Sequence, residues 1–266
     1  LIKLVEENEK IEIFKSAEIL SIEGYVGNFK SKILSENMEK EIEHGVVVVA
    51  TGALEYEPTE YMYGKDGRII TQLELEQLLA EDKINPKNVV MIQCVGSRGE
   101  KVPYCSRICC TTAIKNALQI KEREPDAKVY VLYRDIRTYG FREDFYDKAL
   151  EKGITFLRYD VDSKPRVEVA SGRLKVTVKE PLIDEKISFN PDFVVLSVAQ
   201  VPDPNNEDLS KSLKVPLSKD GFFLEAHMKL RPVDFATEGV FLCGSAHSPK
   251  FIDESISQAE AVVSRA

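Results

Sequence analysis

Short runs of β-branched and aliphatic residues recur along the chain and are separated by polar segments, a pattern typical of buried strands. We expect strands at Ile11–Phe14, Ala17–Glu23, Gly45–Ala50, Asn88–Cys94, Lys128–Tyr133, Ile154–Leu157, Arg166–Val169, Leu174–Val178, Phe193–Val198 and Val240–Cys243. Apolar residues at helical spacing predict helices at Thr71–Ala80, Ser106–Glu122, Arg142–Lys152 and Ile252–Arg265. Strands that alternate with helices predict an α/β fold with a mainly parallel sheet.

Two parts of this pattern are specific enough to predict supersecondary structure. The strand Asn88–Cys94, the helix Ser106–Glu122 and the strand Lys128–Tyr133 have the order and length of a βαβ unit. The segment Arg166–Val178 alternates apolar and polar residues around a Ser171-Gly172 turn, so we expect an antiparallel ribbon that covers the sheet.

Composition narrows the class of protein. The chain has 266 residues, 43% of them hydrophobic, which suits one large domain or two modest ones. Its 36 basic and 44 acidic residues give a net charge of −8, which argues against nucleic acid as a partner. The longest apolar run is Val46–Ala50, so no membrane span is expected.

The start of the chain, LIKLVEENEK, lacks the pattern of a secretion signal, so we expect a cytoplasmic location. The first residue, Leu1, suggests a piece excised from a longer protein.

Cysteine spacing indicates metal or redox chemistry. Four of the five cysteines lie between Cys94 and Cys110, whereas a disulfide scaffold spreads its cysteines along a small secreted domain. They also occupy the turn where a nicotinamide-binding domain would carry G-x-G-x-x-G. Only Gly96 and Gly99 remain in that turn, which argues against NADH or NADPH binding there.

The spacing alone leaves several kinds of cysteine site open. Thiolates at Cys94, Cys105, Cys109 and Cys110 match the ligand number of a [4Fe–4S] cluster, although the ferredoxin C-x-x-C-x-x-C pattern is absent. Four sulfurs also suit zinc, but adjacent ligands strain a tetrahedron. A redox-active disulfide and a set of buried inert thiols fit the same spacing.

Two further segments predict the domain organisation. Val46–Gly52 is a strand that leads into a small-residue turn, and Thr237–Ser245 is a strand followed by a turn and a helix. Similar segments occur in flavoprotein reductases of the thioredoxin-reductase type, which have two dinucleotide-binding domains. That similarity implies a discontinuous, partial FAD-binding domain at 1–70 and 201–266. Residues 71–200 would form an inserted NAD(P)-binding-like α/β domain that carries the cysteines.

Longer motifs resemble one family closely. The segments that carry the resemblance are EGYVGNF, CVGSR, PYCSRICCTTAIKNAL, VLYRDIRTYGFRE, GFFLEAHMKLRPVDFAT and CGSAHSPKFIDESISQA. Together they resemble the A subunit of heterodisulfide reductase, which carries flavin and iron–sulfur clusters. The resemblance implies that Cys94, Cys105, Cys109 and Cys110 hold an unusually spaced [4Fe–4S] cluster beside FAD.

The same resemblance implies a set of flavin-site residues. The expected FAD-binding positions are Thr51, Gly52, Gly244, Ser245, Lys250, Glu254, Ser255 and Ile256. Lys115, five residues after Cys110, matches a lysine near flavin N5 and is the expected catalytic residue. Ser245 stands where related flavoproteins of the thioredoxin-reductase type have an aspartate. The family's N-terminal glycine loop and ferredoxin-type inserts are missing, so this chain alone would hold FAD weakly or not at all.

The resemblance also implies a function. We expect part of an oxidoreductase that passes electrons between FAD and the cluster, within flavin-based electron bifurcation. Its expected partners are other heterodisulfide reductase subunits, a hydrogenase or dehydrogenase that donates electrons, and further copies of the chain in a homo-oligomer. Two different functions compete with this one: an NAD(P)H-dependent flavoprotein disulfide reductase and a non-catalytic scaffold that carries a cluster.

Overall fold

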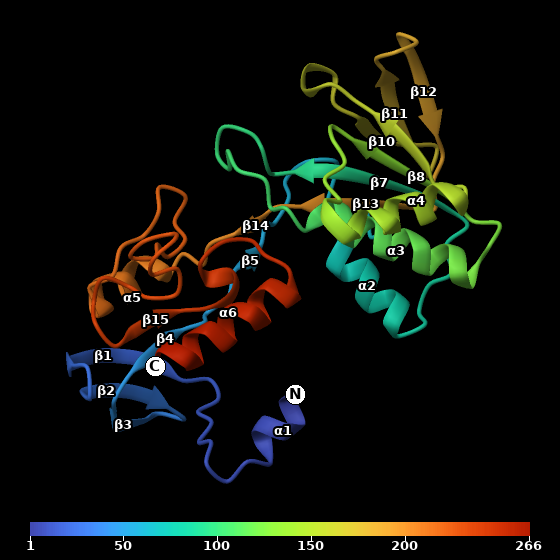
Figure 1. The fold of residues 1–266 in the computed structure, drawn as a ribbon. Helices are drawn as coiled ribbons and strands as arrows, with labels where there is room; N and C mark the ends of the chain where they lie inside the picture. Colours follow the sequence, from blue (N-terminus) through green and yellow to red (C-terminus); the bar gives the residue numbers. More distant parts are fainter. The chain divides into compact units, whose positions relative to one another are not determined.

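The computed structural model describes residues 1–266 and divides them into two compact units. Unit 1 comprises Leu1–Ala53 and Pro202–Ala266, and unit 2 comprises Leu54–Val201 (Figure 1). The segment Leu54–Ile70 therefore lies with unit 2, whereas the sequence pattern assigned it to the flavin domain. The assignment of one unit to flavin and of the other to the cysteines stays a prediction.

Unit 2 is built around a parallel sheet of five strands in the order β6-β13-β7-β8-β9. Its strands are β6 (Ile69–Thr71), β7 (Asn88–Val95), β8 (Lys128–Tyr133), β9 (Thr155–Arg158) and β13 (Phe193–Val198). One face carries the helices α2 (Gln72–Ala80), α3 (Cys109–Arg123) and α4 (Glu143–Glu151) (Figure 1). The expected parallel α/β sheet and its βαβ unit are confirmed.

An antiparallel sheet covers the opposite face of the parallel sheet (Figure 1). Its strands are β10 (Arg166–Ala170), β11 (Arg173–Glu180) and β12 (Glu185–Phe189). Hairpin pairing of β10 with β11 confirms the expected ribbon. The remaining short elements of the unit are β5 (Leu54–Glu55), β14 (Gln200–Val201), η1 (Gly140–Arg142) and η2 (Val161–Ser163).

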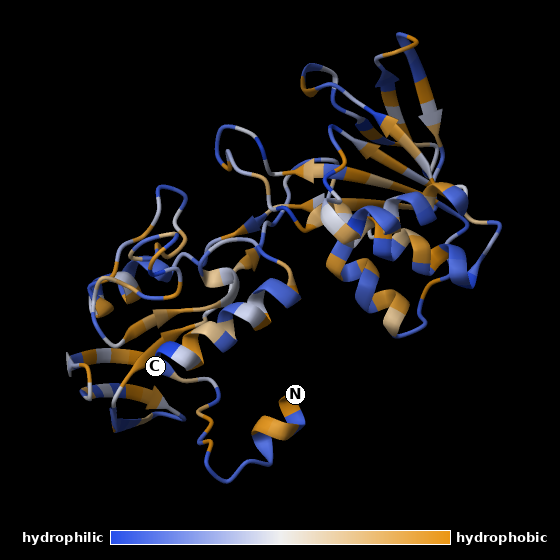
Figure 2. Ribbon diagram, viewed as in Figure 1, coloured by the Kyte–Doolittle hydropathy of each residue, from blue (hydrophilic) through white to orange (hydrophobic).

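The parallel strands are hydrophobic because both of their faces are covered (Figure 2). In β7, Val89 and Met91 pack in the core under the helices, whereas Val90 and Ile92 pack in the core under the antiparallel sheet. This alternation follows from the two-residue period of a strand and fixes the side to which each β7 residue points.

Unit 1 contains an antiparallel meander and a pair of parallel strands. The meander is β1 (Glu18–Tyr25), β2 (Asn28–Ser35) and β3 (Met38–His44), and the pair is β4 (Val47–Val49) and β15 (Val240–Leu242). The helical elements are α1 (Ile2–Glu6), α5 (Asn206–Leu213), η3 (Gly244–Ala246) and α6 (Ile252–Arg265). No helix is both long and apolar enough to cross a membrane.

The structure corrects two expected elements. Ile11–Phe14 is not a strand; it pairs with no other strand, and Ile11 and Ile13 remain exposed. The helix expected from Ser106 begins only at Cys109, because Arg107 adopts a left-handed backbone with φ of +62°.

Candidate cysteine and flavin sites

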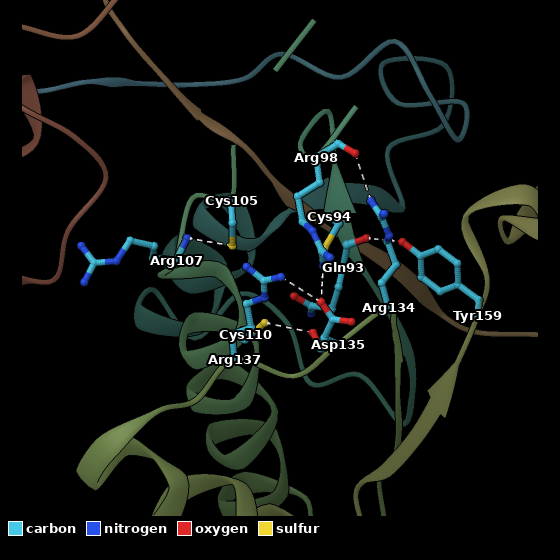
Figure 3. Close-up of polar contacts among 10 residues, drawn as sticks. All are labelled: Gln93, Cys94, Arg98, Cys105, Arg107, Cys110, Arg134, Asp135, Arg137 and Tyr159. Atoms are coloured by element: carbon cyan, nitrogen blue, oxygen red, sulfur yellow. Dashed lines mark hydrogen bonds and ion pairs between the residues drawn. The ribbon is translucent and has the colours of Figure 1, made fainter. Parts of the chain in front are cut away.

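Four free cysteines lie where β7 ends and α3 begins. Figure 3 shows three of them, Cys94, Cys105 and Cys110. Cys94 is the next-to-last residue of β7, and Cys109 and Cys110 open α3. Cys105 lies in the turn before α3 and does not share a helical face with Cys109. A βαβ unit brings a strand end and the following helix start together, which explains how these positions come to share one region.

The backbone at Cys94 is unusual for a residue with a side chain. Its φ is +61°, and the regular pairing of β7 with β13 is interrupted at this point. Hydrogen bonds hold the distorted segment on both sides, because Tyr159 Oη donates to the Gln93 carbonyl at 2.7 Å and Ala199 N donates to the Val95 carbonyl at 2.9 Å. Backbone strain of this kind persists only where the surroundings enforce it and is concentrated at functional sites.

A hydrogen-bonded turn joins Cys94 to the next cysteine. Arg98 N donates to the Tyr104 carbonyl at 3.1 Å, which closes the turn as a small hairpin. The buried Ser106 then accepts a hydrogen bond from Gln200 N at 2.8 Å and anchors the return of the chain. Cys105 is thereby held next to an anchored residue, although it belongs to no helix or strand.

Each of the first two sulfurs has a nearby donor. Arg98 Nη1 lies 3.9 Å from Cys94 Sγ, and Arg107 N donates to Cys105 Sγ at 3.3 Å. Burial raises the pKa of Cys94, while Arg98 acts in the opposite direction because its positive charge favours the thiolate.

The two helical sulfurs are more deeply buried. Cys109 Sγ lies 3.7 Å from the Val198 carbonyl, and Cys110 Sγ lies 3.8 Å from the Asp135 carbonyl. Burial raises the pKa of Cys109 strongly and that of Cys110 to about 11. Negative charge on the neighbouring cysteines adds to both shifts.

Arginines surround this group (Figure 3). Asp135 binds two of them, with Arg98 Nη1 at 2.6 Å and Arg137 Nη2 at 3.1 Å from its carboxylate. Arg134 Nη1 donates to the Arg98 carbonyl at 3.2 Å. A cluster held by four thiolates carries net negative charge, and these guanidinium groups would offset part of it.

Zinc and a four-iron cluster need different spacings between their sulfur ligands. A single tetrahedral zinc ion with Zn–S bonds of about 2.3 Å needs its sulfurs within about 4 Å of one another. Among residues 1–266, no three cysteine, histidine or acidic side chains converge closely enough to hold one metal ion. A four-iron cluster takes each thiolate on a different iron, and therefore accepts ligands that are farther apart. Ligand type and number are those of a four-iron cluster.

In unit 1, the two segments expected to bind flavin lie side by side. β4 and β15 pair in parallel, with Val47 opposite Val240 and Val49 opposite Leu242. Their ends lead to Gly52 and to Gly244-Ser245, and a Cβ atom on Gly52 would lie 4.0 Å from Ser245 Oγ. Both glycines have positive φ, and nothing lies within 4 Å of a Cβ built on Gly244. The backbone of this turn is therefore open to close approach by a ligand. Thr51, the exposed residue before Gly52, shares this edge.

A hydrogen-bond network supports the Gly244 turn. Gly244 N donates to Gln258 Oε1 at 2.8 Å, and Gln258 Nε2 donates to His247 Nδ1 at 3.0 Å. Lys250 Nζ also donates to His247 Nδ1, at 3.2 Å. With two donors on Nδ1, the ring hydrogen resides on Nε2, which donates to Glu225 at 2.8 Å.

This network shifts the pKa values of His247 and Glu225. Burial lowers the pKa of His247, and the positive charge of Lys250 lowers it further. For Glu225, burial acts to raise the pKa, but hydrogen bonds from its own backbone and from His247 hold it below its usual value.

The start of α6 uses two of the expected flavin-site residues to cap the helix. Glu254 accepts a hydrogen bond from Phe251 N at 2.8 Å, and Ser255 Oγ donates to the Phe251 carbonyl at 3.0 Å. Ile256 is half exposed. These contacts fix the helix end that follows the Gly244 turn.

Lys115 lies on α3 in unit 2 and forms an ion pair with Glu76 of α2, with Nζ 2.6 Å from the carboxylate. Both side chains are partly exposed. The expected role of Lys115 beside a flavin stays a prediction.

Sequence reasoning missed residues whose roles arise from distant contacts. Ser106 and Gln200 are 94 positions apart, and Glu225 and His247 are 22 apart. Gln93 gave a local signal, because it is a polar residue inside an otherwise apolar strand.

No family model matches the chain. Among curated proteins, the A subunit of H(2):CoB-CoM heterodisulfide,ferredoxin reductase from Methanothermobacter thermautotrophicus is 41% identical over 252 residues. The match covers 87% of this chain and 38% of that protein. The iron–sulfur A subunit of CoB–CoM heterodisulfide reductase from Methanocaldococcus jannaschii is 38% identical over 248 residues, which covers 85% of this chain and 37% of that protein. The chain thus spans less than two fifths of the length of these relatives.

Among solved structures, thioredoxin reductase from Lactococcus lactis is similar in fold, with a TM-score of 0.58 and 18% sequence identity. The match covers 94% of this chain and 73% of that chain. At this identity the likeness concerns the fold alone, and it confirms the expected reductase-like class.

Proposed function

The chain belongs to the family of heterodisulfide reductase A subunits, and from this membership we propose that it is an electron-transferring part of a related oxidoreductase. In this proposal Cys94, Cys105, Cys109 and Cys110 hold a [4Fe–4S] cluster in unit 2. The turns at Thr51-Gly52 and Gly244-Ser245 contact FAD in unit 1. When bound, the flavin supplies two-electron chemistry and the cluster supplies one-electron transfer.

One observation carries the proposal: four unpaired thiols come from the strand end, the anchored turn and the helix start of one βαβ unit. The chain's own residues would set the chemistry there. The βαβ unit positions the ligands, while burial excludes water and Arg98 donates toward Cys94. Bound iron would replace the protons of the ligating thiols and so offset the raised pKa values of Cys109 and Cys110.

Residues in unit 1 suit the flavin side of the proposal. The open Gly244 turn allows close approach of a ligand, and Lys250 supplies positive charge beside it. A helix N-terminus such as that of α6 favours negative charge on a bound reduced flavin. Ser245 would contribute a hydroxyl where related flavoproteins of the thioredoxin-reductase type have an aspartate.

The test is anaerobic reconstitution of the 266-residue chain with iron and sulfide, followed by iron and sulfide analysis and electron paramagnetic resonance. We expect roughly four irons per chain. Cys94→Ser and Cys109→Ser should each lower iron incorporation, because each removes one ligand.

Cys243→Ser is the matched control, since Cys243 is the fifth cysteine and is buried in unit 1. Its iron content should equal that of the wild type. Stoichiometric zinc with no iron, or an unchanged iron content in Cys94→Ser, would contradict the assignment.

The proposed partners follow from the names of the relatives, which include heterodisulfide, ferredoxin and H2. We propose that the whole protein acts in flavin-based electron bifurcation, as a homo-oligomer with other heterodisulfide reductase subunits and a hydrogenase or dehydrogenase. Co-purification of the full-length protein with such subunits, and its mass in solution, test this part.

A further inference from the structure

A buried glutamine precedes the first of the four cysteines and has no hydrogen-bond partner. Gln93 is 1% exposed, and both its Nε2 and Oε1 atoms are buried and unpaired. An unpaired buried amide is costly, because it loses its hydrogen bonds to water without replacement. Native proteins seldom keep such a group unless it has a partner that is present in another state.

The fold determines where this side chain points. Val89 and Met91 of β7 pack in the core beneath α3. Gln93 follows Met91 by two residues in the same strand, so its side chain points to the same face. Gln93 is also the last residue before the left-handed Cys94 interrupts the strand. Its side chain therefore lies under the first turn of α3, which carries Cys109 and Cys110.

The surrounding polar groups do not satisfy the amide. On the same face, Gln72 Nε2 donates to Ser197 Oγ at 3.1 Å, and Asn116 Nδ2 donates to Gln72 Oε1 at 2.9 Å. Gln93 takes no part in this buried network, although Ser197 lies on the adjacent strand. The hydroxyl of Thr111, in the first turn of α3, is likewise buried and unpaired. Unsatisfied polar atoms are thus concentrated beside the cysteines.

We propose that Gln93 is a positioning and tuning residue whose amide N–H group donates a hydrogen bond to a sulfur atom of the cluster held by the four cysteines. This inference rests on the proposed function. A donor aimed at a cluster sulfur stabilises the more negative, reduced state and so raises the reduction potential. Gln93 touches neither flavin nor substrate and acts only through the cluster.

The test compares the wild-type chain with Gln93→Met, which keeps the length of the side chain but removes the amide. Both proteins are reconstituted anaerobically with iron and sulfide. The cluster potential is then measured by redox titration, and the thermal stability of the metal-free chain is measured in parallel. We expect Gln93→Met to bind as much iron as the wild type, with a cluster potential shifted to more negative values.

The metal-free protein gives a second readout that does not depend on a cluster. Removing an unpaired amide should leave the metal-free Gln93→Met chain at least as stable as the wild type, with an equal or higher Tm. Met91→Leu is the matched control, because it alters the same face of β7 two residues earlier. It should leave the potential unchanged.

A buried water could satisfy the amide instead, and this rival has a different signature. Gln93→Met would then lower the Tm of the metal-free chain and leave the cluster potential unchanged. That result overturns the inference.

Should Gln93→Met fail to fold, Gln93→Glu is tested in its place, because it replaces the amide donor with an acceptor. A cluster potential of Gln93→Glu equal to that of the wild type would overturn the inference as well. Absence of iron from the wild type would refute the proposed function itself.

Discussion

The ring of Tyr56 lies directly over Gly96, so closely that a Cβ atom on Gly96 would lie 2.2 Å from Cδ1 and Cε1 of the ring. Gly96 also has φ of +66°, a conformation that side chains disfavour. The turn that follows Cys94 therefore requires glycine for two independent reasons.

We predict that Gly96→Ala destabilises unit 2 by about 2 kcal/mol or more, because it adds overpacking to backbone strain. Chemical denaturation of the metal-free chain measures this change. Gly99→Ala, three residues later, is the control, since nothing lies within 4 Å of its Cβ position and its φ is not positive. Equal stability of the two variants would contradict the role assigned to Tyr56.

The same contact bears on nucleotide binding. Tyr56 covers Gly96, one of only two glycines left where a phosphate-binding loop would lie. We predict that neither NADH nor NADPH binds unit 2, because the pyrophosphate needs close approach to an open glycine backbone. Calorimetric titration checks this, with a glycine-loop thioredoxin reductase as positive control. Micromolar affinity would favour an NAD(P)H-dependent disulfide reductase.

We predict that Lys115→Met shifts the flavin potential of the full-length, cofactor-loaded protein and leaves its iron content unchanged. Loss of the exposed ion pair with Glu76 should cost less than about 1 kcal/mol of stability. Glu76→Gln is the control, since it breaks the same ion pair but keeps the lysine. A flavin potential unaffected by Lys115→Met would reduce Lys115 to a surface ion-pair partner.

The network at the Gly244 turn predicts a pH dependence. The pKa of His247 is lowered below 6.5 in the folded chain by burial and by Lys250. The unfolded chain therefore takes up more protons, and stability falls as the pH drops through 6.5 and below. The pKa of Glu225 is also lowered, and this carboxylate adds a loss of stability only as the pH falls below 4.5.

His247→Gln should flatten the stability of unit 1 between about pH 7 and pH 5, because it removes the titrating ring. Thermal unfolding across this range measures the slope. His227→Gln provides the comparison, because the exposed His227 accepts hydrogen bonds from the backbone amides of Lys229 and Leu230. A slope that is the same in wild type and His247→Gln would exclude His247 as its source.

Sequence periodicity predicted the parallel sheet well, because strands covered on both faces are almost continuously apolar, as in Asn88–Val95. It missed β2, in which polar exposed residues alternate with buried ones, and β3, which is mostly charged and has no buried residue. It wrongly made Ile11–Phe14 a strand, because local composition does not reveal whether a partner strand exists.

For the cysteine site, the sequence named the four thiols but could not show how each is held. The left-handed Arg107 and the hydrogen bond between Gln200 N and Ser106 keep Cys105 in the turn before the helix. Such long-range contacts leave no local pattern. The unpaired state of Gln93 was equally invisible, since it depends on the whole packed interior.

The hairpin between Cys94 and Cys105 allows the number of residues between these two cysteines to change during evolution, whereas the spacing from Cys105 to Cys110 is fixed. The tip of the hairpin runs from Gly99 to Val102 and is closed by a single backbone hydrogen bond of 3.1 Å. Nothing lies within 4 Å of a Cβ position on Gly99. Insertions or deletions there would lengthen or shorten a surface loop without displacing either flank. The interval from Cys105 to Cys110 has no such freedom, because Ser106 is anchored and α3 starts three residues later. Homologous sequences should therefore vary in length before the second cysteine and keep the last three in fixed register.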